Sequence, residues 1–133
     1  MNGERGRVAP RCVLVTGACG NLGSAVVRRL VAEGFAVRAF DLPTAANRRA
    51  AATMPAGAAA HLGDITRAAD VEAAMAGVDA VVHLAGVLPP LSERRPELAR
   101  AVNVEGTRLL ASAASRARAD MPFVFASSCS VYG

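Results

Sequence analysis

The stretch from Val13 to Gly23, V-L-V-T-G-A-C-G-N-L-G, constrains the fold of this chain more than any other part of it. A short apolar run leads into three glycines that are spaced three residues apart. The apolar positions that follow recur at helical intervals, at Leu22, Val26, Val27 and Leu30. This pattern predicts a buried strand that turns sharply into a helix, with a ligand bound at the turn.

Each glycine has a separate expected role. Gly17 ends the strand where the chain must reverse tightly. Gly20 leaves room for a phosphate beside the backbone, and Gly23 lets the helix pack against the strand. The N–H groups at the helix start and the helix dipole favour an anion, so the turn predicts a bound diphosphate. We expect the backbone around these glycines to contribute to that site at Cys19, Asn21 and Leu22.

The spacing of the glycines is Gly-x-x-Gly-x-x-Gly, which departs from the common dinucleotide fingerprint Gly-x-Gly-x-x-Gly. An ordinary glycine-rich turn between a strand and a helix is the alternative interpretation. The turn alone does not decide between the two.

Composition limits the class of protein. The chain has 133 residues and is 53% hydrophobic, which is enough for the core of one domain. The net charge is +4, but the basic residues are all arginines, scattered from Arg5 to Arg118. Since no basic patch is interleaved with aromatic residues, no nucleic-acid partner is expected.

The three cysteines, Cys12, Cys19 and Cys129, have no metal-ligand spacing, and their number is odd. We therefore expect a reduced, cytoplasmic protein without a metal site. Residues 1–11 form a flexible N-terminus with no apolar core, so they do not resemble a signal peptide. No apolar run approaches the length of a membrane span, and no membrane association is expected.

Strand and helix patterns alternate along the rest of the chain. This predicts an α/β fold of the Rossmann type, with a doubly wound parallel sheet of order 3-2-1-4-5. The expected strands are Cys12–Thr16, Ala36–Phe40, Ala58–Leu62, Ala80–Leu84 and Phe123–Ala126. The expected helices are 21–33, about 47–53, 67–76 with Thr66 as its cap, and one long helix over 96–118. Residues 87–95 are expected to form a loop.

Asp41 follows the second strand, about 20 residues after the glycine turn. A carboxylate there is placed to accept hydrogen bonds from the hydroxyls of an adenosine ribose and would repel a 2′-phosphate, so NAD is favoured over NADP. Arg38, Arg48 and Arg49 are close enough in sequence to keep NADP as the alternative.

Two later strand ends add candidate residues. Asp64 follows the third strand, near the expected place of the adenine ring, although it could equally be an ordinary loop acid. The fourth strand ends in His83-Leu84-Ala85-Gly86, whose small residues let a cofactor approach the backbone. His83 itself is interpreted as a packed strand residue.

Six segments together resemble the extended short-chain dehydrogenase/reductases, and more narrowly the NAD-dependent epimerase/dehydratase group. The resemblance runs from about Cys12 to the last residue. The segments are Thr16-Gly17-x-x-Gly20-x-x-Gly23, Asp41, Gly63-Asp64-Ile65, His83-Leu84-Ala85-Gly86, Asn103-Val104-x-Gly106-Thr107 and Ser127-Ser128-x-x-Val131-Tyr132-Gly133.

The resemblance implies a role for each matching position on the cofactor side. The three glycines would hold the diphosphate and Asp41 the ribose. Asp64 and Ile65 would lie at the adenine. Further along the cofactor, the path would be lined by Leu84, Ala85 and Gly86.

Asn103 is also counted among the cofactor-binding residues, since the resemblance implies that it lies near the active site and supports the backbone at the end of the fourth strand. Ser128 matches the catalytic serine or threonine that hydrogen-bonds the substrate oxygen, and Ser127 is the second choice for that role. Tyr132 does not match the catalytic tyrosine and is interpreted as a packing residue.

The chain departs from the family pattern in one respect, because it contains no lysine and therefore no Tyr-x-x-x-Lys motif. We expect residues 12–133 to be an incomplete NAD(P)-binding domain that stops after the fifth strand and is inactive alone. The complete protein would act on a nucleotide sugar or a related alcohol or carbonyl compound, as a homodimer. The alternative is a module that binds a dinucleotide or a partner without catalysis.

Overall fold

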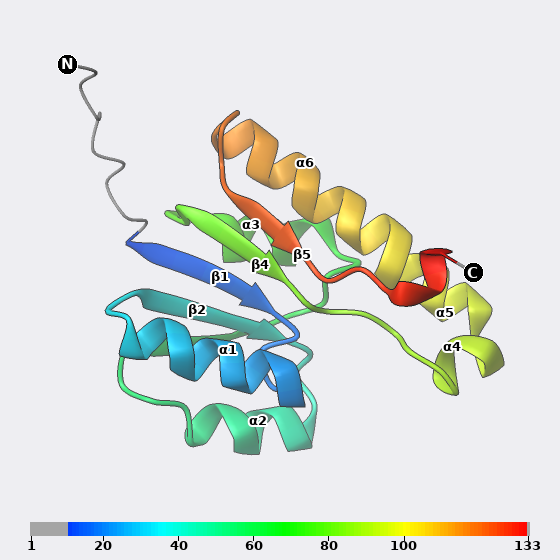
Figure 1. Ribbon diagram of the computed structural model, residues 1–133, viewed down its shortest axis with the longest axis horizontal. Helices are drawn as coiled ribbons and strands as arrows, with labels where there is room; N and C mark the ends of the chain where they lie inside the picture. Colours follow the sequence, from blue (N-terminus) through cyan, green and yellow to red (C-terminus); the bar gives the residue numbers. More distant parts are fainter. Residues whose placement is uncertain (1–10, 133) are drawn as a thin grey trace.

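Five parallel strands form one sheet in this protein, whose computed structural model describes residues 11–132 (Figure 1). The order is β3-β2-β1-β4-β5, which confirms the predicted topology. The strands are β1 (Cys12–Thr16), β2 (Ala36–Asp41), β3 (Ala58–Leu62), β4 (Ala80–His83) and β5 (Phe123–Phe125). The predicted flexible N-terminus lies outside the described residues except for Arg11, and so does Gly133 at the other end.

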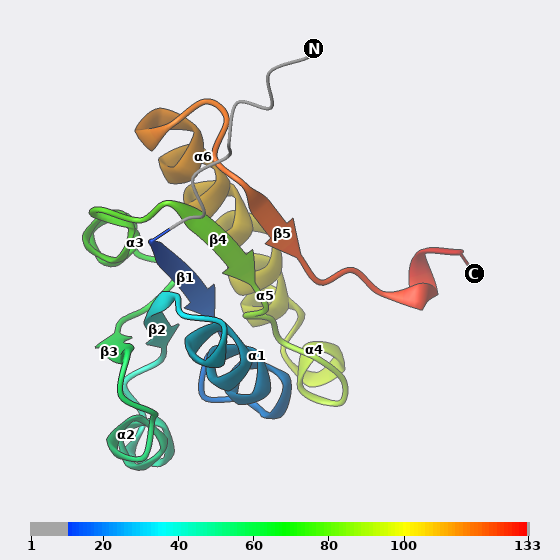
Figure 2. The ribbon, with the colours of Figure 1, turned by 60° about the vertical axis from the view of Figure 1, so that its left-hand side comes forward.

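Helices cover both faces of the sheet. Helix α1 lies on one face, and α3 and α6 lie on the other (Figure 2). The α-helices are α1 (Asn21–Ala32), α2 (Ala45–Ala52), α3 (Ala68–Met75), α4 (Leu91–Arg94), α5 (Pro96–Arg100) and α6 (Thr107–Ala117). A π-helix, η1 (Ala101–Gly106), joins α5 to α6, and a 3₁₀-helix, η2 (Cys129–Tyr132), ends the described chain.

The alternation of side chains along β1 builds two cores. Val13 and Val15 face α1 and pack with Val27, whereas Leu14 faces α3 and α6 and packs with Leu110. Successive residues of a strand point to opposite faces, so a strand covered on both faces is continuously apolar. The first strand therefore joins both layers of the domain.

The region from 87 to 118 differs from the predicted loop and single long helix. The loop contains the short helix α4, and the long helix widens into the π-helix η1 before it continues as α6. At the end of the widened turn, a Cβ on Gly106 would lie 2.9 Å from Cγ2 of Ile65. The absence of a side chain at Gly106 therefore lets the helix pack closely against Ile65.

The prediction that Thr66 caps α3 is wrong. Arg67 is the N-cap residue and makes no side-chain capping bond. The Thr66 N–H and hydroxyl instead donate to Oδ1 of Asp64, at 2.8 and 2.7 Å. The carboxylate of Asp64 thus engages Thr66 in a local turn, as aspartates commonly do in loops.

The other end of α3 is completed by a residue from the sheet. Nη1 of Arg38, on β2, donates to the carbonyl oxygens of Ala74 at 2.7 Å and Ala76 at 2.5 Å. The last turn of α3 has no basic residue of its own. Arg38 therefore supplies both the donors and the positive charge that the carboxyl end of a helix favours.

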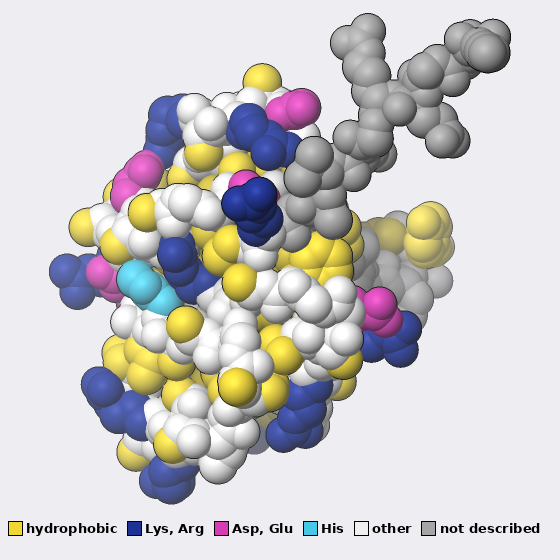
Figure 3. Space-filling model, turned by 90° about the vertical axis from the view of Figure 1, so that its left-hand side faces the viewer, with side chains coloured by type: hydrophobic (Ala, Val, Ile, Leu, Met, Phe, Trp, Pro, Cys, Tyr) yellow, Lys and Arg dark blue, Asp and Glu magenta, His cyan; other side chains and the backbone are white. Residues whose placement is uncertain are grey.

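The arginines do not gather into a continuous stripe on the face shown in Figure 3, where they alternate with acidic, apolar and uncharged groups. Among residues 11–132, no helix is long and apolar enough to cross a membrane.

Candidate dinucleotide-binding site

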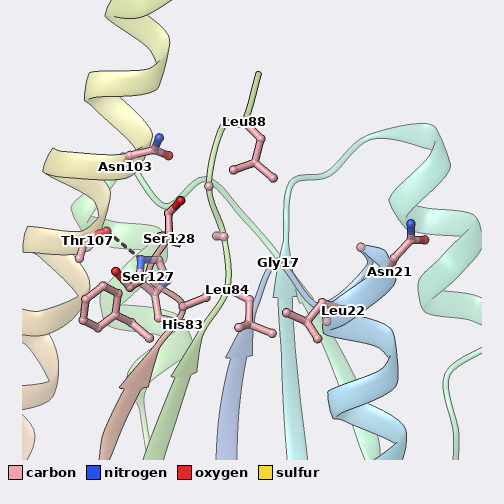
Figure 4. A pocket seen from close by; sticks show the side chains of 16 residues that line it. Gly17, Asn21, Leu22, His83, Leu84, Leu88, Asn103, Thr107, Ser127 and Ser128 are labelled. Carbon is pink, nitrogen blue, oxygen red and sulfur yellow. Dashed lines mark hydrogen bonds between the residues drawn. The ribbon is translucent and has the colours of Figure 1, made fainter. Parts of the chain in front are cut away.

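A cavity of about 670 Å³ opens at the carboxyl ends of the strands, between the glycine turn and the end of β4 (Figure 4). The strand order reverses between β1 and β4, and ligands of open α/β sheets bind at such a switch point. Ten of the predicted site residues line the cavity: Gly17, Gly20, Asn21, Leu22, Gly23, Leu84, Ala85, Gly86, Asn103 and Ser128.

The backbone of the glycine turn leaves no space for side chains at two of its three glycines. Gly17 has a φ of +66°, and a Cβ on it would lie 2.9 Å from the Ala85 nitrogen. A Cβ on Gly23 would lie 1.9 Å from the Gly17 carbonyl oxygen. By contrast, a Cβ on Gly20 would meet only that oxygen at 3.4 Å, so it would project without a backbone clash.

Helix α1 begins at the floor of the cavity. Gly20 is its N-cap residue, and it has no side chain with which to bond the first N–H groups. The first N–H groups of an α-helix have no acceptor within the helix. Asn21, Leu22 and Gly23 form this first turn and line the cavity, so their N–H groups are available to an anion there.

Asp41 ties the glycine turn to the end of β2. Its Oδ2 accepts the Cys19 N–H at 2.9 Å. Its Oδ1 accepts the Leu42 N–H at 2.8 Å and Nδ2 of Asn47 at 3.1 Å. A carboxylate has about four acceptor positions, so these three donors leave about one for a further partner.

Cys19 lies on the side of the turn that faces α2. Its thiol contacts the Asn47 carbonyl oxygen at 3.7 Å and lines a second, smaller cavity of about 170 Å³. Burial, and secondarily the negative charge of Asp41, raises the pKa of the Cys19 thiol. A raised pKa makes a thiol a poor nucleophile, so the contribution of Cys19 to the turn is its backbone N–H.

The structure does not bring Asp64 and Ile65 into the main cavity. The side chain of Ile65 is buried in the core beneath α3 and α6. Asp64 is engaged with Thr66, and its N–H donates to Oδ2 of Asp70 at 2.8 Å. Both residues follow β3, two strands away from the switch point.

Asn103 holds the segment that follows β4. Its Oδ1 accepts the Val87 N–H at 2.7 Å, and its Nδ2 donates to the Val87 carbonyl oxygen at 3.0 Å. A Cβ on Gly86 would lie 3.3 Å from Oδ1 of Asn103, so a larger residue would crowd this pair of bonds. Asn103 lies in the π-helix, and such widened turns often occur at functional sites.

Five cavity residues were not predicted to belong to the site: His83, Leu88, Thr107, Phe125 and Ala126. The interpretation of His83 as a packed strand residue agrees with its 4% exposure, but the residue also borders the cavity. Its Nδ1 lies 2.6 Å from Oγ1 of Thr16, and its Nε2 lies 2.8 Å from Oγ1 of Thr107. Burial lowers the pKa of His83 below its ordinary value.

The two serines that follow β5 form part of the cavity wall, on the side of β4 opposite the glycine turn (Figure 4). Both Ser127 and Ser128 line the cavity. The Tyr132 side chain is 90% exposed and does not pack, contrary to its interpretation as a packing residue. Among residues 11–132, no group of three His, Cys, Asp or Glu side chains could hold a metal ion.

The sheet order and the glycine turn at its switch point define an α/β protein of the Rossmann type. Residues 13–133 match the model of the NAD dependent epimerase/dehydratase family. The chain belongs to this family.

Named relatives agree with this assignment. The chain is 40% identical over 98 residues to 3 beta-hydroxysteroid dehydrogenase type 7 of Rattus norvegicus, a match that covers 71% of this chain and 29% of the relative. It is 37% identical over 144 residues to UDP-glucose 4-epimerase 3 of Oryza sativa subsp. japonica, covering 99% of this chain and 38% of the relative. The chain thus spans about a third of the length of these relatives.

A solved structure agrees with the fold and with the expected cofactor. A short-chain dehydrogenase/reductase superfamily protein from Agrobacterium tumefaciens, solved with bound NAD, is 38% identical to this chain and has a TM-score of 0.69. The match covers 91% of this chain and 34% of that protein. Both this structure and the family description support NAD as the cofactor.

Proposed function

We propose that this chain is the NAD-binding part of an oxidoreductase that acts on a nucleotide sugar or a related alcohol or carbonyl compound. The observation that carries the proposal is the cavity at the switch point, bounded by a glycine turn whose backbone excludes side chains at Gly17 and Gly23. NAD, when bound, supplies the hydride acceptor or donor for such chemistry. The residues of this chain bind and orient it.

The diphosphate would occupy the floor of the cavity. Gly20 leaves the space, and the N–H groups of Asn21, Leu22 and Gly23 provide donors for the phosphate oxygens. Because Gly17 and Gly23 are fixed by close backbone contacts, the donors are positioned before the ligand binds. Preorganisation of this kind lowers the ordering cost of binding.

Asp41 would accept a ribose hydroxyl at its remaining acceptor position, and its charge would repel the 2′-phosphate of NADP. The alternative cofactor NADP would need a cation beside that phosphate, and Arg48 and Arg49 are exposed on α2. A comparison of affinity for NAD and NADP therefore tests the role of Asp41. Asp64 and Ile65 lie outside the main cavity, so in this proposal they would reach the adenine only at the edge of the site that is formed by the end of β3.

Ser128 would hydrogen-bond the reacting oxygen of the substrate. It lies on the cavity wall across from the glycine turn, where a substrate could approach the end of the cofactor remote from Asp41. Asn103 would hold the Val87 segment, which forms the rim on this side. The relatives named above act on a hydroxysteroid and on UDP-glucose, so both compounds serve as probes.

Isothermal titration of the 133-residue chain with NAD tests the binding proposal. We expect saturable binding with a dissociation constant between about 10 μM and 1 mM, and weaker binding of NADP. The Gly20→Ala variant should lose most of the NAD affinity, because its methyl group would occupy the phosphate space. Ser115→Ala, a small change on the exposed face of α6 away from the cavity, should bind as the unchanged chain does.

Absence of NAD binding by a folded chain would overturn the proposal. A second assay follows NADH absorbance after addition of NAD with a 3β-hydroxysteroid, and follows the 4-epimer formed from UDP-glucose by chromatography. We expect binding without turnover from this chain alone, which also fits the alternative of a non-catalytic binding module. Turnover that Ser128→Ala abolishes would exclude that alternative and support the role of Ser128.

Two further parts of the proposal concern the cell. We propose that the complete protein is a cytoplasmic homodimer. Sedimentation velocity of the complete protein tests the oligomeric state, and fractionation of the source cells tests the location.

A further inference from the structure

Thr16, His83 and Thr107 form a chain of hydrogen bonds from the sheet to the cavity wall. Oγ1 of Thr16 lies 3.1 Å from the Ala85 nitrogen and 3.1 Å from the Leu84 nitrogen, so it accepts from both N–H groups. The Leu84 N–H is shared with the Thr16 carbonyl oxygen at 3.2 Å. The acceptor capacity of the Thr16 hydroxyl is therefore used by the turn that follows β4.

The two N–H groups that the Thr16 oxygen accepts determine which atom donates in the bonds from Thr16 to His83 and from His83 to Thr107. Since the Thr16 oxygen already accepts two N–H groups, its own proton is donated to Nδ1 of His83, 2.6 Å away. His83 is then neutral and carries its proton on Nε2. That N–H donates to Oγ1 of Thr107 at 2.8 Å.

The proton of the Thr107 hydroxyl has no acceptor among residues 11–132, since the bond to His83 is the only side-chain hydrogen bond of Thr107 in that range. Thr107 lines the cavity, and Figure 4 shows it beside His83 on the wall that α6 provides. The N–H of His83 occupies one of the two lone pairs of the Thr107 oxygen, so the hydroxyl proton points away from the ring and can be donated to a ligand.

We propose that His83 is a positioning residue of the cavity, which fixes the Thr107 hydroxyl as a hydrogen-bond donor to an oxygen of the bound dinucleotide and holds Thr16 against the Leu84–Ala85 turn. The proposal rests on the proposed binding of NAD in this cavity. It also implies that binding depends on the protonation state of a residue that does not itself contact the cofactor.

Protonation of His83 would break this arrangement. An Nδ1–H group would need to donate to the Thr16 oxygen, which could accept it only by releasing the Ala85 or Leu84 N–H. Release of the Ala85 N–H would loosen the turn that faces Gly17, where a Cβ on Gly17 would lie within 3.1 Å of three backbone atoms of Leu84 and Ala85. Acidification should therefore weaken NAD binding.

Among residues 11–132, the ring of His83 has no charged partner. The elements packed against the ring present Thr16 from β1, Phe123 from β5 with ring centroids 6.2 Å apart, and Thr107 from α6. Nearby on the helix, Glu105 and Arg108 are ion-paired to each other at 3.2 Å and have exposed side chains. Burial alone lowers the pKa of His83, so its protonation occurs below the ordinary histidine pKa of about 6.5.

Nitrogen NMR of the chain labelled with ¹⁵N-histidine tests the tautomer without any ligand. We expect His83 at pH 7.5 to show an unprotonated Nδ1 and a protonated Nε2. His61 is the internal reference, because it is the only other histidine. A proton on Nδ1 of His83, or a charged ring at that pH, would overturn the proposal.

NAD titrations of two Thr107 variants test the donor. Thr107→Val keeps the shape of the side chain and removes the hydroxyl, and we expect it to lower NAD affinity about ten-fold, the value of one hydrogen bond. Thr107→Ser keeps the hydroxyl and should restore most of that affinity. Circular dichroism establishes that both variants are folded under the titration conditions.

The same titrations between pH 7.5 and pH 5 test the link to His83. We expect NAD affinity of the unchanged chain to fall on acidification, and the fall to disappear in His83→Gln while it persists in His61→Gln. If the unchanged chain binds NAD but Thr107→Val binds equally well, or the pH dependence survives in His83→Gln, the inference fails and the proposed function stands. If the folded chain binds no NAD at any pH, the proposed function fails and the ligand-binding role of Thr107 fails with it.

Discussion

A pair of alanine substitutions in the glycine turn separates folding from binding. At Gly23, the new Cβ would lie 1.9 Å from the Gly17 oxygen, 2.8 Å from the Gly17 carbonyl carbon and 2.9 Å from the Ala18 Cα. All three atoms belong to the backbone, so relief requires that α1 move away from β1 by about 1 Å or more, because Cβ contacts shorter than 3.0 Å essentially never occur. Overpacking by a rigid contact costs about 3 kcal/mol.

For a domain of 133 residues, that loss corresponds to a fall of about 10 °C in the melting temperature. Gly20→Ala is the matched substitution, because its Cβ would meet one atom at the ordinary distance of 3.4 Å and the φ of Gly20 is −73°. Its stability should change by less than about 1 kcal/mol, the range of N-cap effects. Thermal and urea unfolding followed by circular dichroism measure both variants, and titration calorimetry measures NAD binding.

The reasoning would be refuted by a Gly23→Ala protein that melts within about 2 °C of the unchanged chain. It would also be refuted if Gly20→Ala retained full NAD affinity, since the space at Gly20 would then not be the phosphate site. Loss of stability in both variants to the same extent would show that the turn tolerates no side chain at either position.

Three further outcomes follow from the contacts of single residues. Asn103→Ala removes both hydrogen bonds to Val87 and should cost about 1–3 kcal/mol in urea unfolding; unchanged hydrogen exchange at the Val87 amide would contradict this. Asp41→Asn keeps the shape of the side chain but removes the charge, so NAD affinity should fall about ten-fold and NADP affinity less; equal losses for the two cofactors, measured by calorimetry, would count against a ribose contact. Burial lowers the pKa of His83, so on acidification the unfolded chain binds a proton at this residue before the folded chain does. The free energy of unfolding should therefore be highest above about pH 6.5. Below that pH it should fall by up to about 1.4 kcal/mol per pH unit. Urea unfolding at pH 7.5 and pH 5.5 measures this loss, and His83→Gln should reduce it.

The strand order and the place of the cavity could be predicted because they depend on patterns that are local in sequence. The apolar run before Gly17, the helical repeat after Gly23 and the alternation of strands with helices each occupy a few residues. Right-handed crossovers then limit the topology to very few arrangements. Outside residues 87–118, strand and helix ends were predicted to within one or two residues of those observed.

The helix region and the histidine contacts could not be predicted in the same way. A π-helix adds one residue to a turn, and the apolar positions Leu98, Val102 and Leu109 fit a continuous α-helix nearly as well. His83 bonds to partners 67 and 24 residues away in sequence, and no local pattern indicates such partners. Thr66 differs, because its partner Asp64 is a near neighbour in sequence, but that carboxylate accepts the Thr66 hydroxyl only once the turn has formed.

The bonds from Arg38 to α3 have a consequence for the order of folding. Helix α3 has eight residues and lacks a side-chain N-cap. Its final carbonyl groups, those of Ala74 and Ala76, accept hydrogen bonds from Arg38, which precedes them by 36 and 38 residues. Isolated helices of this length are unstable in water. A peptide over 66–78 should therefore be unstructured alone, and in the whole chain α3 should form only after β2 has joined the sheet. The nucleus of folding should accordingly lie in β1, α1 and β2, with α3 assembled on a surface that those elements have already made.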